Sequence, residues 1–179
     1  MASEVEASRK AILLGGAQGG VIAGLVMLIF ALIHAGITGA GFWTPLRLIS
    51  ASMGDVPTLI ASGEADGAMS TAGILLCGVV IHFTFAAGWG IVFVRLFPRL
   101  SGSTALGVGL LYGLTVWGLM TWGVLIWLDR TMYDRVQLAG GAFFFEHLLY
   151  GAFVALAPSL ARRYPDRVPV DPILGLRLT

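Results

Sequence analysis

The sequence predicts an all-α fold: a bundle of four transmembrane helices with a short interfacial helix in the first outer loop. The first observation is composition, because 57% of the 179 residues are hydrophobic and 12% are charged, whereas a soluble domain is about 25% charged. The second is the segregation of charge. No Asp, Glu, Lys or Arg occurs in 11–46, 67–94 or 100–128, and Glu146 is the only one in 136–161. Each run exceeds the roughly 20 residues that a spanning helix needs.

The predicted spans are roughly 12–39, 71–95, 104–128 and 139–161. In hydrocarbon the backbone must satisfy its own hydrogen bonds, and these runs are too long and too uniformly apolar for barrel strands. The first run follows Arg9 and Lys10 as in a signal peptide, but it is too long for one and lacks a small-residue cleavage site. We therefore expect it to be retained, within a single membrane domain covering 1–179.

Basic residues predict the orientation. With both termini in the cytoplasm, the inner side holds Arg9, Lys10, Arg95, Arg99, Arg162, Arg163, Arg167 and Arg177, and the outer side holds Arg47, Arg130 and Arg135. This excess inside is the usual bias. We expect a multi-pass protein of a bacterial inner (plasma) membrane. A net charge of +1 without a separate basic patch gives no sign of nucleic-acid binding, and the single Cys77 excludes an internal disulfide.

Small residues spaced by four recur in three of the predicted helices. The ladders are Gly16–Gly20–Gly24, Ala105–Gly109–Gly113 and Gly151–Ala155–Ser159. Such spacing makes one face of a helix thin, so that another helix can approach closely. We interpret the ladders as packing faces of a tight bundle, although glycine is also simply common in membrane helices.

The first outer loop, about 40–70, predicts a short helix at roughly 44–54. Thr44 can cap this helix, with Pro45 at its first position. Leu46 and Ile49 then share one apolar face. The helix is expected to lie on the membrane surface, either as a connector or as a lid over a site in the bundle.

Three tryptophans in the third predicted helix, Trp117, Trp122 and Trp127, are five residues apart. An α-helix turns by about 100° per residue, so this spacing spreads them around the helix and predicts no single stripe. Trp127 is expected to anchor the helix at the membrane interface.

Four titratable side chains fall inside the predicted spans: His34, His82, Glu146 and His147. At about 1.5 Å per residue the histidines lie roughly 8, 17 and 12 Å from the outer ends of their helices. Intramembrane ionisable residues are costly, which calls for a functional hypothesis.

One interpretation is a cofactor. Two histidines on facing helices can hold a haem, and His82 and His147 are the best pair by depth, with His34 as a third candidate ligand. Glu146 would orient a ligand. The sequence has no HxxxH, no CxxCH and no second acidic ligand. We therefore predict no metal site and expect no cofactor, with haem b as the alternative.

A second interpretation is a set of interhelical hydrogen bonds. A charged Glu146 would cost several kcal/mol in the bilayer, so it is expected to be protonated. Tyr150, one turn further on, is its nearest candidate partner, and Gln18 is a candidate for another interhelical contact. Such bonds contribute about 0.6 kcal/mol each. A proton or solute path is the third interpretation, and a transporter this small would have to oligomerise or have more polar lining.

The stretches "VIHFTFAAGWGIVFVRLFPRL", "GLLYG" and "FFFEHLLYG" together resemble the YagU-like uncharacterised bacterial inner-membrane proteins. The resemblance covers about 80–165 and rests on His82, Phe97, Pro98, Glu146 and His147. It implies a small α-helical membrane protein without a soluble catalytic domain, and no particular activity.

The sequence offers no nucleophile with a base, no phosphate-binding loop and no metal-ligand cluster. We therefore expect a non-catalytic integral membrane subunit that packs within or against a larger respiratory, photosynthetic or transport complex. Its partners would be lipid and either other membrane subunits or a second copy of the chain. The alternative is a haem- or metal-binding electron-transfer protein that uses the intramembrane histidines, with a quinone or haem partner.

Overall fold

The computed structural model describes residues 9–51, 68–128, 130, 133–134, 136 and 141–164, and these contain helices and turns but no strand. Four helical stretches are long and apolar enough to cross a membrane: Arg9–Ile37, Ala72–Leu96, Gly102–Leu125 and Gly141–Ala161. The predicted all-α fold with four spanning helices is therefore confirmed.

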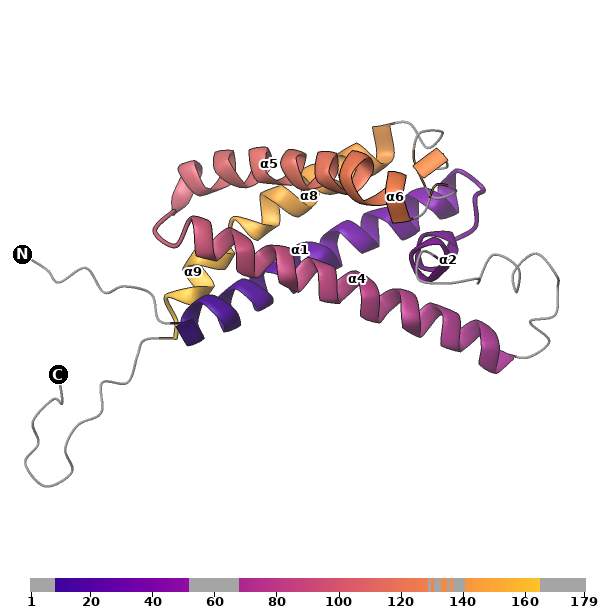
Figure 1. The fold of residues 1–179 in the computed structure, drawn as a ribbon, viewed down its shortest axis with the longest axis horizontal. Helices are drawn as coiled ribbons and strands as arrows, with labels where there is room; N and C mark the ends of the chain where they lie inside the picture. Colours follow the sequence, from indigo (N-terminus) through magenta and orange to yellow (C-terminus); the bar gives the residue numbers. More distant parts are fainter. Residues whose placement is uncertain are drawn as a thin grey trace, which may run out of the picture.

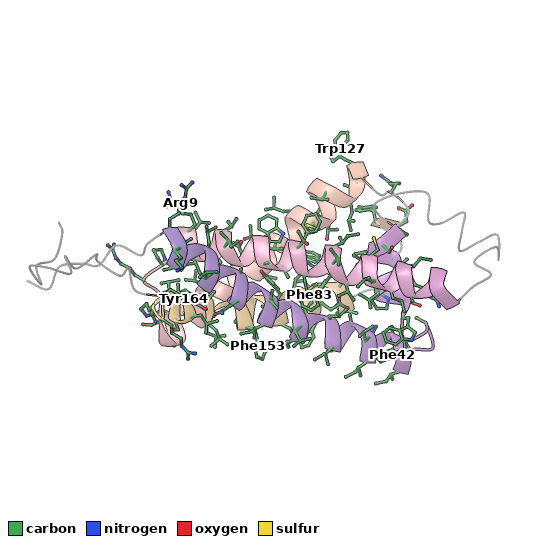
Figure 2. All side chains as sticks on the ribbon, turned by 90° about the horizontal axis from the view of Figure 1, so that it is seen from below. Arg9, Phe42, Phe83, Trp127, Phe153 and Tyr164 are labelled. Carbon is green, nitrogen blue, oxygen red and sulfur yellow. The ribbon has the colours of Figure 1, made fainter. Side chains whose placement is uncertain are left out.

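The helices form two crossed layers (Figure 1). The elements are α1 (Arg9–Ile37), α2 (Thr44–Ala51), α4 (Ala68–Leu96), α5 (Gly102–Gly118), the π-helix η1 (Leu119–Leu125), α6 (Ile126–Leu128), α8 (Gly141–Val154) and α9 (Ala157–Ala161). The α5–α8 pair lies on the α1–α4 pair, and α8 also packs against α1. We call the end with Arg9 and Tyr164 the terminal end, and the opposite end, near Phe42, the loop end (Figure 2).

Glycine brings α1 and α4 into direct backbone contact. A Cβ on Gly16 would lie 2.6 Å from the Cα of Ile91, and one on Gly20 would overlap the carbonyl oxygen of Ala86. From the other side, a Cβ on Gly90 would lie 2.6 Å from the Cα of Gly20. No side chain larger than hydrogen fits at this crossing, which is how a spanning pair packs without a hydrophobic driving force.

Glycines also bring the backbones of α5 and α8 into close contact. A Cβ on Gly109 would overlap the carbonyl oxygen of Gly151, and one on Gly113 would overlap that of His147. A Cβ on Gly151 would lie 3.1 Å from the Cα of Gly113. Ser159, the last member of the third predicted ladder, is exposed and lies off this face.

The fourth span is broken near the terminal end. α8 ends at Val154 and α9 begins at Ala157, with Pro158 in its first turn. Proline lacks an N–H and its ring clashes with the carbonyl four residues earlier, here that of Val154. The break turns α9 onto α1, where Gly19 accepts the close approach of Ala157.

The third span contains a π-helix, and this overturns one prediction. In η1 the hydrogen bonds close over five residues rather than four, so residues five apart come onto one face. Trp117 and Trp122 accordingly stack edge to face, with ring centroids 4.9 Å apart. The expectation that these two rings point apart was wrong because it assumed α-helical geometry throughout. Trp127 is 86% exposed and projects from the bundle (Figure 2).

The short helix α2 packs into the bundle. Leu46 is buried against α4, where a Cβ on Gly78 would overlap its carbonyl oxygen. Gly78 is ten residues after Ala68, about 15 Å along α4. The hydroxyl of Thr44 donates to the carbonyl oxygen of Ala40 at 2.6 Å and does not cap the helix as predicted. Positions 52–54 of the predicted helix lie outside the described residues.

Candidate functional site

Two adjoining cavities lie in the half of the bundle nearer the loop end. The deep cavity, about 120 Å³, is lined mainly by residues of α1, α4, η1 and α8. The loop-end cavity, about 520 Å³, lies among α1, α2, α4 and α8. Both are lined by Met27, Ile49, His82 and Phe143. Small-molecule sites run from about 300 to 1,000 Å³, so the loop-end cavity has the size of a ligand site and the deep one does not.

His82 stands where the two cavities meet. Its Nε2–H donates to the carbonyl oxygen of Gly24 on α1 at 2.9 Å. A Cβ on Gly24 would lie 3.4 Å from this nitrogen and 2.6 Å from the Cβ of Ala86, so the glycine keeps the approach open. The bond fixes the tautomer of a neutral ring and leaves Nδ1 as an acceptor.

His147 is buried and lines the deep cavity. Its Nδ1–H donates to the carbonyl oxygen of Phe143, one turn earlier, at 2.8 Å. The Phe143 ring meets the imidazole edge to face, with centroids 4.5 Å apart. Nε2 is therefore the free nitrogen, so each of these two imidazoles keeps one lone pair that no described residue uses.

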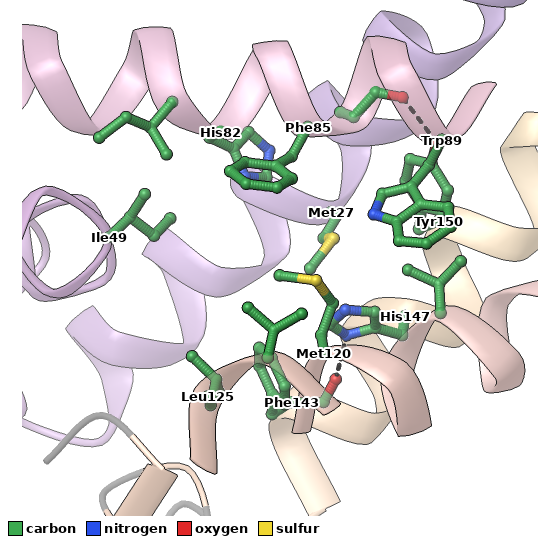
Figure 3. A pocket seen from close by; sticks show the side chains of 14 residues that line it. Met27, Ile49, His82, Phe85, Trp89, Met120, Leu125, Phe143, His147 and Tyr150 are labelled. Atoms are coloured by element: carbon green, nitrogen blue, oxygen red, sulfur yellow. Dashed lines mark hydrogen bonds between the residues drawn. The ribbon is translucent and has the colours of Figure 1, made fainter. Parts of the chain in front are cut away.

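Tyr150 does not pair with Glu146 as predicted. Its hydroxyl donates to the carbonyl oxygen of Ala86 on α4 at 2.7 Å (Figure 3). Tyr112 of α5 makes the equivalent bond to the carbonyl oxygen of Trp89, also at 2.7 Å. The two tyrosines thus tie α5 and α8 to α4, and Tyr150 also lines the deep cavity.

Glu146 and His34 face the loop-end cavity from α8 and α1. Both side chains are half-buried, and neither makes a hydrogen bond or ion pair to another described residue. His34 stacks on Phe30, with ring centroids 6.0 Å apart, and Phe30 in turn contacts Phe145 of α8 at 5.2 Å. This aromatic contact holds the two polar side chains on facing walls.

α2 covers the loop-end cavity. Thr44, Pro45, Leu48 and Ile49 all line it. The hydroxyl of Thr44 is used by the Ala40 carbonyl, so α2 presents a mainly apolar surface to the cavity. Of the two interpretations of this helix, its position matches a cover over the site.

Gln18, the remaining polar residue predicted to make an interhelical contact, does not line either cavity. Its side-chain amide donates to the hydroxyl of Tyr164 at the terminal end. The structure thus gathers His34, His82, Glu146, His147 and Tyr150 around the cavities and leaves Gln18 out. Sequence reasoning missed Met27, Trp89 and Met120, which also line the deep cavity. Nothing in their local sequence distinguishes them from ordinary core residues.

A haem between His82 and His147 does not fit these residues. The deep cavity that both rings line is far smaller than a small-molecule site. The Nε2 of His82 is also engaged by the Gly24 carbonyl. In the part of the chain that the structure describes, no three His, Cys, Asp or Glu side chains are grouped to hold a metal.

Comparison with known proteins found no matching family model, no matching curated protein and no matching solved structure. The resemblance to the YagU-like proteins therefore stays a prediction.

Proposed function

We propose that this protein is an integral membrane protein that binds a lipid-soluble ring compound of the quinone class in the loop-end cavity. The observation that supports this most is the pair His34 and Glu146. They line a cavity of about 520 Å³ from facing helices, and no described residue satisfies either side chain. Unpaired polar groups in an otherwise apolar pocket typically orient a ligand.

The chemistry of the two side chains suits both redox states of such a ring. A quinone has carbonyl oxygens that accept hydrogen bonds, and a quinol has hydroxyls that donate them. A neutral imidazole and a protonated carboxyl can each donate and accept. Apolar side chains such as Leu28 and Leu48 supply the walls against which a ring can pack.

Equilibrium binding of a short-tailed quinone to the detergent-purified protein tests the proposal. Binding should saturate, and His34→Phe and Glu146→Leu should each weaken it, because each removes a polar group from the pocket. Gln18→Leu is the matched control, since it removes a polar side chain from the same helix as His34 but at the terminal end. The absence of saturable binding, or equal binding by all the variants, would refute the proposal.

A second proposal concerns the outward face of α4 and keeps the expectation of a membrane subunit. Only 17% of the most apolar stretch of α4 is buried, against 33–39% for the other spans. Along this face a Cβ added at Gly73 or Gly88 would meet nothing within 4 Å, and Cys77 and Thr84 are exposed. Small residues of this kind favour the close approach of another helix, which supports docking against a further membrane subunit or a second copy.

Cys77, the single cysteine, reports on this face directly. Oxidative cross-linking in native membranes should give a disulfide-linked homodimer if a second copy packs there, and no such product from Cys77→Ser. If the neighbour is a different subunit, a bifunctional thiol-to-amine reagent at Cys77 should give one discrete heterologous product. A protein that stays monomeric under both reagents and purifies alone from mild detergent would contradict this proposal.

A further inference from the structure

We infer that the deep cavity is a binding site for a soft monovalent metal ion, Cu(I). Four side chains from four separate elements line it: Met27 of α1, His82 of α4, Met120 of η1 and His147 of α8. In Figure 3 the thioethers of Met27 and Met120 point toward one another in the space between the two imidazoles. Two thioethers and two imidazoles thus line one small cavity.

The hydrogen bonds of the two histidines prepare them as ligands. A metal-binding imidazole is held in place by the bond that its other nitrogen makes, commonly to a backbone carbonyl. His82 makes such a bond to Gly24 and His147 makes one to Phe143. Each ring is therefore fixed in the tautomer that leaves a lone pair free, which is Nδ1 of His82 and Nε2 of His147.

The lining selects for a soft ion of low charge. It contains no Asp, Glu or Cys, so every candidate ligand is neutral. A divalent ion would keep its whole charge in apolar surroundings, at a steep cost in free energy. A monovalent ion carries half that charge, and thioether sulfur with imidazole is a ligand set that Cu(I) prefers. Zinc favours imidazole together with thiolate or carboxylate, and magnesium favours oxygen ligands. Both therefore match this site poorly.

The size and the construction of the cavity agree with a single ion. About 120 Å³ is too small for an organic ligand of ordinary size. Met120 lies in η1, where the π-helix departs from α-helical geometry. π-Helical turns inside α-helices are frequent at functional sites, and here the turn carries a candidate ligand.

This inference does not depend on the proposed function of the loop-end cavity. His34 and Glu146 do not line the deep cavity. Copper binding should therefore survive His34→Phe, whereas quinone binding should not.

Anaerobic competition with the Cu(I) chelator bicinchoninate tests the inference, in a Cys77→Ser background that removes the exposed thiol. The protein should retain one Cu(I) per chain, and X-ray absorption should show both sulfur and imidazole nitrogen bound to the copper. Met27→Leu and Met120→Leu should each weaken retention by roughly tenfold or more, because even the loss of a residue that only supports a ligand costs about 10–100-fold in metal affinity. Met69→Leu, which removes another of the six methionines of the chain, should leave retention unchanged.

Methionine and leucine have similar volumes, so these substitutions should preserve the fold, which circular dichroism and gel filtration check. The inference is overturned if the Met27→Leu/Met120→Leu double variant retains Cu(I) as well as the parent does. It is equally overturned by an absorption spectrum without sulfur, or by Zn(II) displacing the copper at equal concentration. His147→Phe gives an independent readout, because it should remove nitrogen from the copper spectrum.

Discussion

Substituting alanine for Gly109 should destabilise the bundle, whereas the same change at Gly107 should not. Both glycines lie in α5, two residues apart. A Cβ on Gly109 would overlap the carbonyl oxygen of Gly151 and lie 3.1 Å from the Cβ of Ala155, while one on Gly107 would meet nothing within 4 Å. The pair therefore isolates helix contact from every other effect of replacing glycine.

The atoms around Gly109 determine how much stability Gly109→Ala should lose. The obstacle at Gly109 is backbone, which cannot rotate away as a side chain can. α5 and α8 must therefore separate, and overpacking of this kind costs about 1–3 kcal/mol. Alanine also favours the helix over glycine by as much as about 1 kcal/mol in soluble hosts. At Gly107 only this favourable contribution operates, so Gly107→Ala should be neutral or stabilising.

Unfolding by sodium dodecyl sulfate in mixed micelles, followed by circular dichroism, measures the difference. Gly109→Ala should lower the free energy of unfolding by about 1–3 kcal/mol relative to Gly107→Ala. A repeat in α4 with Gly90→Ala and Gly88→Ala should give the same ordering, since a Cβ on Gly90 would meet α1 and one on Gly88 would meet nothing. Equal stability within each pair would refute the close backbone packing of both layers.

Three further predictions concern polar groups and orientation. Thr121 is fully buried and its hydroxyl has no hydrogen-bond partner among the described residues. Thr121→Val should therefore stabilise the protein by about 1 kcal/mol in the same unfolding assay. A lower free energy of unfolding would instead show that the hydroxyl has a hydrogen-bond partner. Glu146 should show the infrared stretch of a protonated carboxyl at neutral pH, absent from Glu146→Gln, because a charged carboxylate there would cost several kcal/mol; a wild type without that stretch would contradict this. If both termini are cytoplasmic, a cysteine at Ala40 should react with an impermeant thiol reagent in intact cells and one at Ser101 should not, in a Cys77→Ser background; the reverse labelling would invert the topology.

The number and position of the spanning helices were predictable because charge is so strongly segregated along this chain. Apolar runs uninterrupted by charge fix where helices must lie in hydrocarbon, whatever their partners. The break after Val154 had a local signal in Pro158, which marks a helix boundary. The π-helix had none that we recognise. Its stretch Leu119–Leu125 looks like any apolar helix, and the stacking of Trp117 on Trp122 depends on it.

The candidate site was predictable as a set of residues and not as an arrangement. Polar side chains inside apolar runs identified His34, His82, Glu146 and His147. Which nitrogen of each ring is free depends on helix rotations that glycine contacts set, such as that of Gly24 beside His82. The hydrogen bond from Tyr150 to α4 replaced the expected one to Glu146 for the same reason, because a contact between helices cannot be read from one helix alone.

The crossing of α1 and α4 also has a mechanical consequence. The two helices are locked where Gly20 meets Ala86, and α1 continues from there to Ile37 past both cavities. That arm is about 25 Å long at 1.5 Å per residue. A change of one degree in the crossing angle of α1 and α4 moves the loop end of α1 by only about 0.4 Å over that length. α2 packs between α1 and α4 at the loop end. A movement of this short helix would therefore change the width of the loop-end cavity while the contact between Gly20 and Ala86 stays in place.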